Sequence, residues 1–376
     1  MSSPKAVLAA LAAFAAVSGA LPAHAQTVKI GVVQTTTGGS AALYGIEQKN
    51  AIELVVKEAN ASGALGPLKL EVVHYDDGAD RGQTVNIYQR LISRDNVSAI
   101  LGPTLTTSAY AADPIAQQAG VPVIASSNTA PGLTKIGEYI FRVSPPESLV
   151  TPQVIDAVLK RHPVKRVAQI YGIDDQLTKA AYAVQKQALE DRKLKIVATE
   201  TFQKGDVDFS AQLTKIKATN PDLIVLGALA EESAGIIRQA HRLGIPDSVV
   251  FIGTQSSIST KFFELGGESA QGLVVGTAWY SDLPDPKSQA FVQQYKQTYN
   301  NHQPDIYSAY GHDAASLLIE AIKRAGSGDR KAIRDQLAQI KDYPGVLGPI
   351  GFDEQREPTV TPKVLIAKEG KFVPYE

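Results

Sequence analysis

The side chains best suited to chemistry in this sequence are hydroxyls that follow a short apolar segment. Residues 104–108 (TLTTS) come directly after the apolar residues 99–101 and directly before a helical stretch over 109–119. Hydroxyls beside the free N–H groups and the positive end of a helix dipole form a receptor for carboxylates and other anions. One Ser or Thr at such a place is more often a plain N-cap. The group of hydroxyls at a strand end favours anion binding.

A second polar segment, Ser126 to Thr129, follows the next apolar run, residues 121–125. In open α/β sheets, ligands bind beyond the carboxyl ends of the strands. The two polar segments can therefore converge on one ligand, although each taken alone could also be an ordinary turn.

Other kinds of site find little support in the sequence. The glycines in residues 37–40 do not have the spacing of a dinucleotide-binding loop, and no phosphate-binding P-loop motif occurs. The histidines are scattered without metal-ligand spacing, there is no cysteine, and no G-x-S-x-G elbow is present. The adjacent acids at 76–77 and 174–175 would point to opposite faces of a strand. We therefore expect no enzyme activity, no catalytic residues, no metal and no cofactor.

Charge and composition exclude a further class of partner. The chain has 37 Lys and Arg against 38 Asp and Glu, with no basic block. Nucleic acid binding depends on clustered positive charge, so we expect no nucleic acid partner.

The elements that must position the hydroxyls alternate between strand-like and helical segments. Strands are expected at 28–33, 68–75, 99–101, 121–125 and 139–143, with helices over 44–61 and 83–94 between them. A second cycle begins after 144–146, with strands at 166–171, 196–202, 223–227 and 249–253. This alternation predicts an α/β fold with two doubly wound domains. The late helices over 288–299 and 314–325 are expected to pack back on an earlier domain.

The N-terminal residues predict export from the cytoplasm. Met1 to Ala25 reads as a signal peptide with a positive residue at Lys5, an apolar run, and a small-x-small cleavage site at 23–25. The apolar run over 6–17 is shorter than the ~20 residues of a spanning helix. No cysteine is available for lipid attachment or disulfides. We expect a soluble protein of the periplasm.

Several short segments, in their order along the chain, resemble the leucine/isoleucine/valine-type periplasmic binding proteins, the type I solute receptors of ABC importers. The segments are 29–33 (KIGVV), 44–45 (YG), 75–77 (YDD), 102–103 (GP), 120–124 (GVPVI), 139–142 (YIFR), 206–209 (DVDF) and 311–315 (GHDAA). Each is weak alone, but the resemblance extends over the whole mature chain.

The resemblance implies two Rossmann-like lobes joined by three hinge crossovers, near 143–146, 275–278 and 351–355. One lobe would comprise 26–145 and 276–353, and the other 146–275 and 354–376. A ligand would bind between the lobes and stabilise the closed form, which docks on an ABC permease in the inner membrane. We expect a monomer.

The resemblance also implies which residues hold the ligand. Thr106, with Thr107 beside it, would hold a carboxylate, Ser127 and Thr129 would form a second loop facing the carboxylate and ammonium of an amino acid, and Tyr44 would form a side wall. The other lobe departs from the family pattern. Gln176-Leu177 and Leu229 stand where tyrosines are usual, and Gln255 stands where an acid normally pairs with the ammonium.

Two ligand classes follow from these departures. The first is an aliphatic amino acid, if Asp174, Asp175, Glu231 or Glu232 replaces the missing charge. The second is an aromatic or aliphatic acid that lacks an ammonium, which Gln255 and Leu229 favour slightly, because a neutral amide cannot neutralise a buried cation. A different role on the same fold is also open, namely a ligand-sensing receptor partner that binds an amide or another small molecule and takes no part in import.

Overall fold

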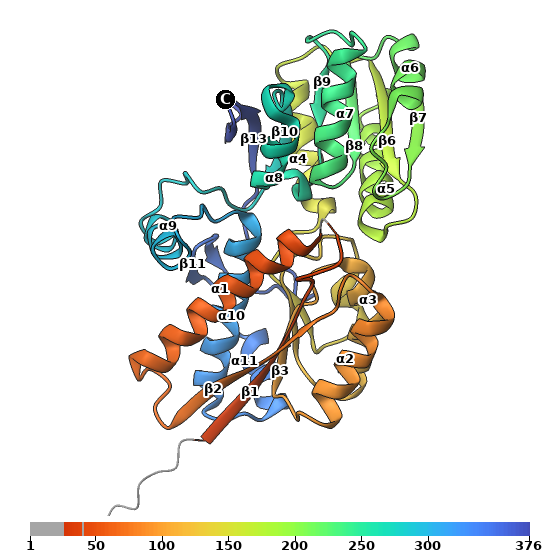
Figure 1. Cartoon of the computed structure of the whole chain (residues 1–376). Coiled ribbons are helices and arrows are strands. Elements are labelled where there is room, and N and C mark those ends of the chain that lie inside the picture. The colour runs from red at the N-terminus through yellow and green to blue at the C-terminus, as the bar shows by residue number, and fades with distance from the viewer. Residues whose placement is uncertain (1–25, 40) are drawn as a thin grey trace, which may run out of the picture.

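Two separate β-sheets, each covered by helices, build the molecule (Figure 1). The computed structural model describes residues 26–39 and 41–376, and the predicted signal peptide lies outside these residues. Within the described residues, no helix has the length and apolar character required to cross a bilayer.

The first sheet has five parallel strands in the order β2-β1-β3-β4-β5. Its strands are β1 (Gln26–Gln34), β2 (Leu68–Asp76), β3 (Ala99–Leu101), β4 (Val123–Ala125) and β5 (Ile140–Arg142). Its helices are α1 (Ala41–Ser62), α2 (Arg81–Ser93), α3 (Thr106–Gln118) and the 3-10 turn η1 (Leu133–Ile136).

Both faces of this sheet are buried, which explains why its strands are almost wholly apolar. Alternate residues belong to different cores: Leu101 and Ile124 face one, whereas Ile100 and Val123 face the other. The sheet is therefore wound with helices on both sides, as the alternating sequence pattern predicts.

The second sheet has seven strands in the order β14-β13-β10-β9-β8-β6-β7. Its strands are β6 (Arg166–Gly172), β7 (Lys195–Phe202), β8 (Leu223–Gly227), β9 (Val250–Ile252), β10 (Leu273–Thr277), β13 (Lys363–Lys368) and β14 (Lys371–Pro374). β13 and β14 run antiparallel at one edge, and the other five strands are parallel. Its helices are α4 (Glu147–Leu159), α5 (Gln176–Asp191), α6 (Ser210–Ala218), α7 (Ala230–Arg242), α8 (Thr260–Gly266) and the 3-10 turns η2 (Gln255–Ser257) and η3 (Gly267–Ser269).

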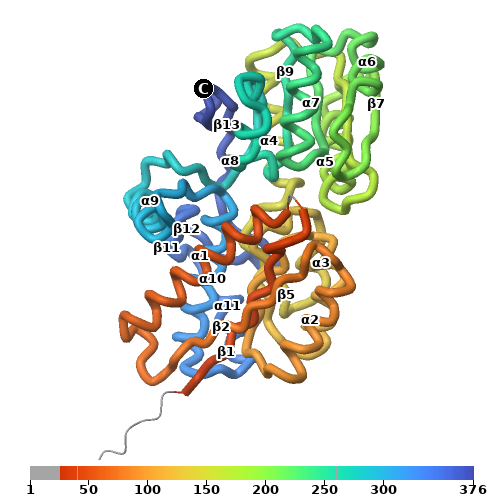
Figure 2. The backbone as a smooth tube through the Cα atoms, in the orientation of Figure 1, coloured from red at the N-terminus to blue at the C-terminus, as the bar shows by residue number. Residues whose placement is uncertain are grey.

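The chain passes between the two lobes three times: after β5, after β10 and before β13 (Figure 2). Between the second and third passages it forms α9 (Pro286–Thr298), α10 (Ile306–Ala325), α11 (Arg330–Ala338) and the small hairpin β11 (Tyr343–Gly345) and β12 (Gly348–Ile350). α10 packs along α1 of the first lobe. The predicted fold class, two doubly wound lobes joined by three crossovers, is confirmed.

Two glycines let α1 approach its neighbours closely. A Cβ on Gly45 would lie 1.9 Å from the carbonyl oxygen of Thr35, and one on Gly311 of α10 would lie 2.6 Å from that of Gln48. α10 itself begins at a capping box, in which Asp305 and Ser308 bond each other's backbone N–H groups. These contacts fix the first turns of α1 and α10 at the boundary between the lobes.

Candidate ligand-binding cleft

The two lobes share one strand order and therefore one natural place for a ligand. β2-β1-β3-β4-β5 in the first sheet corresponds to β7-β6-β8-β9-β10 in the second. In both, the direction of winding reverses between the second and third strands of this order, which are β1 and β3 in the first sheet and β6 and β8 in the second. Ligands of open α/β sheets bind at such switch points, beyond the carboxyl ends of the strands. The loops after β1 and β3 and those after β6 and β8 are thus the expected site.

A small cavity lies where these loops face each other. The first lobe and α10 contribute Tyr44, Thr104, Leu105, Thr106, Ser127 and Tyr307; the second lobe contributes Asp175, Leu177, Leu229 and Ser256. Figure 2 shows α3 and α5 meeting across this boundary. The lobes are in contact here, because Thr107 Oγ1 lies 3.4 Å from Asp175 Oδ2.

Thr106 presents a free hydroxyl to the cavity at the first turn of α3. The N-cap residue Leu105 is extended and no side chain caps the helix. Thr106 Oγ1 is buried and has no hydrogen-bond partner, although the residue is only 2% exposed. Burying an unpaired hydroxyl is unfavourable unless a ligand pairs with it. The hydroxyl is therefore no N-cap, and a bare, positive helix end lies beside it.

The start of α7 mirrors this arrangement from the other lobe. Leu229 is its N-cap and, again, no side chain caps the helix. The Ala230 N–H lies 3.4 Å from the hydroxyl oxygen of Tyr44, across the cleft. Tyr44 stacks on Tyr307 with 4.3 Å between ring centroids. Burial raises the pKa of Tyr44, so its phenol stays neutral.

Ser127 belongs to a buried polar network behind the cavity. Its hydroxyl donates to the Thr104 carbonyl oxygen at 2.9 Å and accepts from Gln48 Nε2 at 2.6 Å. Thr104 Oγ1 in turn donates to Gln34 Oε1 at 2.6 Å. Because the Ser127 proton is already in use, one lone pair remains for a ligand. Ser127 is thus suited to accept a hydrogen bond from a ligand and poorly suited to bind a carboxylate.

Asp175 is the one charged residue in the cavity wall. It is 7% exposed and caps α5, since Oδ1 accepts from the Thr178 N–H at 3.1 Å. No Lys or Arg lines the cavity. The wall therefore offers hydrogen-bond donors at the start of α3 and an acceptor at Asp175.

Four of the predicted site residues line the cavity: Tyr44, Thr106, Ser127 and Leu229. Thr107 bridges the lobes beside it, and the exposed Gln176 donates its backbone N–H towards Thr107 Oγ1 at 3.4 Å. Thr129 and Gln255 are not among the lining residues, and the Thr129 carbonyl oxygen accepts from the Glu147 N–H at 3.0 Å.

Gln255 is tied to the crossover between the lobes. Its Nε2 donates to the Pro145 carbonyl oxygen at 2.9 Å, and its Oε1 accepts from the Tyr310 hydroxyl at 3.1 Å. Its backbone N–H lies 3.3 Å from a carboxylate oxygen of Glu147, whose pKa is raised by burial. The neutrality of Gln255 consequently says little about the charge of the ligand.

Of the four acids considered as replacements, only Asp175 lines this cavity. Asp174 is exposed and accepts from the Lys204 N–H, whereas Glu231 and Glu232 line a different cavity beside α7. Ser256 and Tyr307 complete the wall but had no signal of their own in the sequence. Ser256 is the immediate neighbour of Gln255. The predicted lining residue and the observed one therefore differ by a single position in the sequence.

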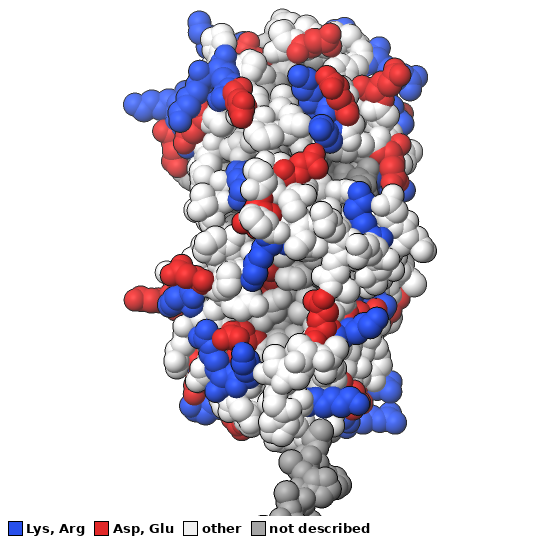
Figure 3. Space-filling model, turned by 90° about the vertical axis from the view of Figure 1, so that its left-hand side faces the viewer, with Lys and Arg blue, Asp and Glu red and all other residues white. Residues whose placement is uncertain are grey.

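The surroundings of the cleft fit a binding role. Within residues 26–39 and 41–376, no group of three or more His, Cys, Asp or Glu side chains is placed to hold a metal ion. The face in Figure 3 carries acidic and basic residues interspersed, without a large field of one sign.

Comparisons with known proteins agree with this geometry. The family model described as "Periplasmic binding protein" matches residues 27–367. A leucine-, isoleucine-, valine-, threonine- and alanine-binding protein of Pseudomonas aeruginosa is 27% identical, with 92% of this chain and 90% of that protein covered. A branched-chain amino acid transporter substrate-binding protein of Streptococcus pneumoniae, solved with isoleucine, is 30% identical with a TM-score of 0.85 over 92% of this chain and 98% of that one. An ABC transporter solute-binding protein of Rhodopseudomonas palustris, solved with 3,4-dihydroxybenzoic acid, is 26% identical with a TM-score of 0.83 over 93% and 95%.

Proposed function

The chain belongs to the periplasmic binding protein family, as a type I member of the leucine/isoleucine/valine-binding type, and from that premise we propose that its ligand is a small α-amino acid. Members of this family are solute-binding proteins of ABC importers and not enzymes. The remaining question is therefore which solute the cleft accepts.

The observation that carries the proposal is that one small cavity holds groups suited to a negative and to a positive charge. The first lobe presents the unpaired hydroxyl of Thr106 and the bare N-terminus of α3. The second lobe presents the Asp175 carboxylate, and Ser127 of the first lobe adds its remaining lone pair. The carboxylate and ammonium of an α-amino acid are adjacent groups of opposite charge, so they can satisfy both at once.

The rest of the wall favours a compact apolar side chain on that amino acid. Tyr44, Leu105, Leu177 and Leu229 supply apolar surface on both sides of the cavity. The cavity itself is narrow, because the facing walls of the two lobes lie close together. Aliphatic amino acids fit this apolar surface.

A second candidate is a hydroxylated aromatic acid. Its carboxylate would take the place at Thr106, and a phenol hydroxyl would donate to Asp175. The stacked rings of Tyr44 and Tyr307 supply an aromatic side wall for the ring. A carboxylate ligand without any hydrogen-bond donor is disfavoured, because it would place a second negative group near Asp175 without a donor between them.

The bodies that move during capture are the two lobes. We assign residues 26–145 and 276–353 to one and residues 146–275 and 354–376 to the other, with hinges at the three crossovers. A ligand that contacts both Thr106 and Asp175 binds the closed form better, and so shifts the population towards it. Delivery to an ABC permease follows from the transporter relatives, whereas a sensing role has no specific support in the geometry.

A matched pair of ligands tests the proposal by isothermal titration calorimetry. The mature protein is refolded from denaturant to release any bound solute and is titrated with L-leucine and with 4-methylpentanoate, which has the same skeleton without the ammonium. We expect leucine to bind more tightly, and Asp175→Asn to reduce that preference. Equal affinity for the two ligands would refute the role of Asp175 as the ammonium partner. Tighter binding of 3,4-dihydroxybenzoate than of any amino acid would favour the second candidate.

A further inference from the structure

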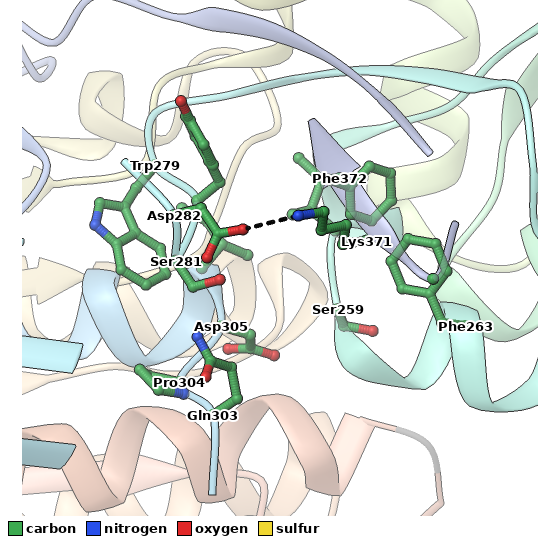
Figure 4. Close-up of a pocket in the computed structure, with 14 residues that line it drawn as sticks. Ser259, Phe263, Trp279, Ser281, Asp282, Gln303, Pro304, Asp305, Lys371 and Phe372 are labelled. Carbon is green, nitrogen blue, oxygen red and sulfur yellow. Dashed lines mark ion pairs between the residues drawn. The ribbon is translucent and has the colours of Figure 1, made fainter. Parts of the chain in front are cut away.

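A second cavity lies at the boundary of the lobes and shares no lining residue with the cleft (Figure 4). Its volume is about 140 Å³. One side is formed by Ile258, Ser259 and Phe263 around the start of α8, together with residues 370–372 of β14. The other side is formed by the crossover residues 279–282 and by residues 303–306 at the start of α10. The cavity thus has walls from both lobes and from a hinge.

Most of the wall is apolar and aromatic. Phe263 and Phe372 pack with 4.9 Å between ring centroids, and the wholly buried Trp279 lines the opposite side. Such surfaces favour a flat or compact apolar body, and their ring faces also attract cations.

One buried hydroxyl in the cavity lacks a hydrogen-bond partner, and a half-buried carboxylate has one oxygen without a hydrogen bond from the protein. The Ser259 hydroxyl has no partner, although the residue is only 6% exposed. The two hydrogen bonds that Asp305 accepts, from the N–H groups of Tyr307 and Ser308, both go to Oδ1, which leaves Oδ2 available. Burial and the neighbouring Glu47 raise the pKa of Asp305, and an ammonium bound beside the carboxyl would act to lower that pKa again.

The charges around the cavity favour a positive ligand. Asp282 and Asp305 are opposed by a single base, Lys371. Lys371 pairs with Asp282. Lys371 Nζ lies 3.7 Å from Asp282 Oδ2 in a largely exposed ion pair (Figure 4). Asp305 therefore remains without a cation.

We propose that this inter-lobe cavity is a second binding site, for a primary ammonium carried on an apolar or aromatic body. The ammonium donates to Asp305 Oδ2 and Ser259 Oγ, and the body packs on Phe263 and Phe372. A ligand of this site needs no carboxylate, whereas the proposed ligand of the cleft does. Binding at this site does not rest on the proposed function of the cleft.

Occupancy of this site is coupled to the cleft, and this second part does rest on hinge closure. Because the walls belong to both lobes, opening the cleft changes the distance between Ser259 and Asp305. A ligand that bridges them binds one state better and biases the hinge towards it. Linkage requires each ligand to change the affinity of the other by the same factor.

The probe for the test is 2-phenylethylammonium, measured by calorimetry on the refolded mature protein. Asp305→Asn keeps a good N-cap residue on α10 and removes the charge, so the fold is retained. We expect this variant to bind the probe about tenfold more weakly, the usual effect of losing a charge-assisted hydrogen bond. Ser259→Ala should also weaken binding, and the neutral 2-phenylethanol should bind worse than the amine. Thr106→Ala, which alters only the cleft, should bind the probe like the wild type.

The outcomes separate this site from the cleft. No binding of the probe, or binding that Asp305→Asn and Ser259→Ala leave unchanged, overturns the proposed site. Loss of probe binding in Thr106→Ala would place the probe in the cleft and would overturn it too. If the probe binds but leaves the affinity of the cleft ligand unchanged, the coupling is refuted and the site stands. None of these results depends on which carboxylate the cleft accepts.

Discussion

Removing the hydroxyl of Thr106 tests the carboxylate end of the cleft. This hydroxyl is buried, has no hydrogen-bond partner among the described residues, and lies at the bare N-terminus of α3. Thr106→Ala deletes a hydrogen bond that only the ligand can use. Leaving a buried polar group of the ligand without its partner costs about 1–3 kcal/mol. The dissociation constant should therefore rise by roughly five- to 150-fold.

The same reasoning predicts that the ligand-free protein is not destabilised. No intramolecular bond of this hydroxyl is lost, so the melting temperature of the refolded variant should stay close to that of the wild type. Thr106→Ser is the matched control, because it keeps the hydroxyl and should keep most of the affinity. Calorimetry with the preferred ligand, together with thermal unfolding in its absence, gives both quantities. Unchanged affinity in Thr106→Ala would refute the placement of the carboxylate.

Three further substitutions follow from the contacts of the described residues. Asp175→Asn retains a helix cap and should weaken the binding of an α-amino acid by about tenfold or more in calorimetry. The melting temperature of this variant, measured without added ligand, should stay close to that of the wild type. Gln255→Ala should lower the free energy of unfolding by about 1–3 kcal/mol in urea titrations, because Pro145 and Tyr310 lose buried partners, with ligand affinity preserved. Partial burial acts to raise the pKa of Asp76, but hydrogen bonds from Thr37, Gly78 and Thr36 outweigh it and hold the pKa at about 2. Since this value is depressed below the ordinary 3.8, the stabilising effect of Asp76 is present above pH 3.8 and is lost as the pH falls towards 2. The melting temperatures of wild type and Asp76→Asn should therefore converge over that range, and a constant difference would contradict the role of these hydrogen bonds.

The sequence predicts the lobes better than it predicts where some helices begin. Strands such as 99–101 and 223–227 lie where their apolar runs place them, because burial on both faces demands such runs. α3 begins at Thr106, three residues before the expected helical stretch, and α7 was not predicted; neither has a capping side chain to mark its start. These two bare ends form opposite walls of the cleft.

The site itself was predicted in part. α10 begins at Ile306, eight residues before the helical stretch expected over 314–325, and the capping box of Asp305 and Ser308 that marks its start is a local signal that the prediction missed. Tyr307 lies in the first turn of this helix, which packs closely on α1 through Gly311 and Gln48. In the short turn η2, no periodicity shows whether Gln255 or Ser256 faces the ligand. The position of Asp175 in the wall depends on how the lobes meet, which no local pattern records.

A crystal structure of the refolded protein with its preferred ligand tests the central claim most directly. The account predicts a small molecule enclosed between the lobes, with its carboxylate within hydrogen-bonding distance of Thr106 Oγ1 and its ammonium within hydrogen-bonding distance of Asp175. A ligand bound between the lobes with its carboxylate turned away from α3, or with no donor directed at Asp175, would contradict it.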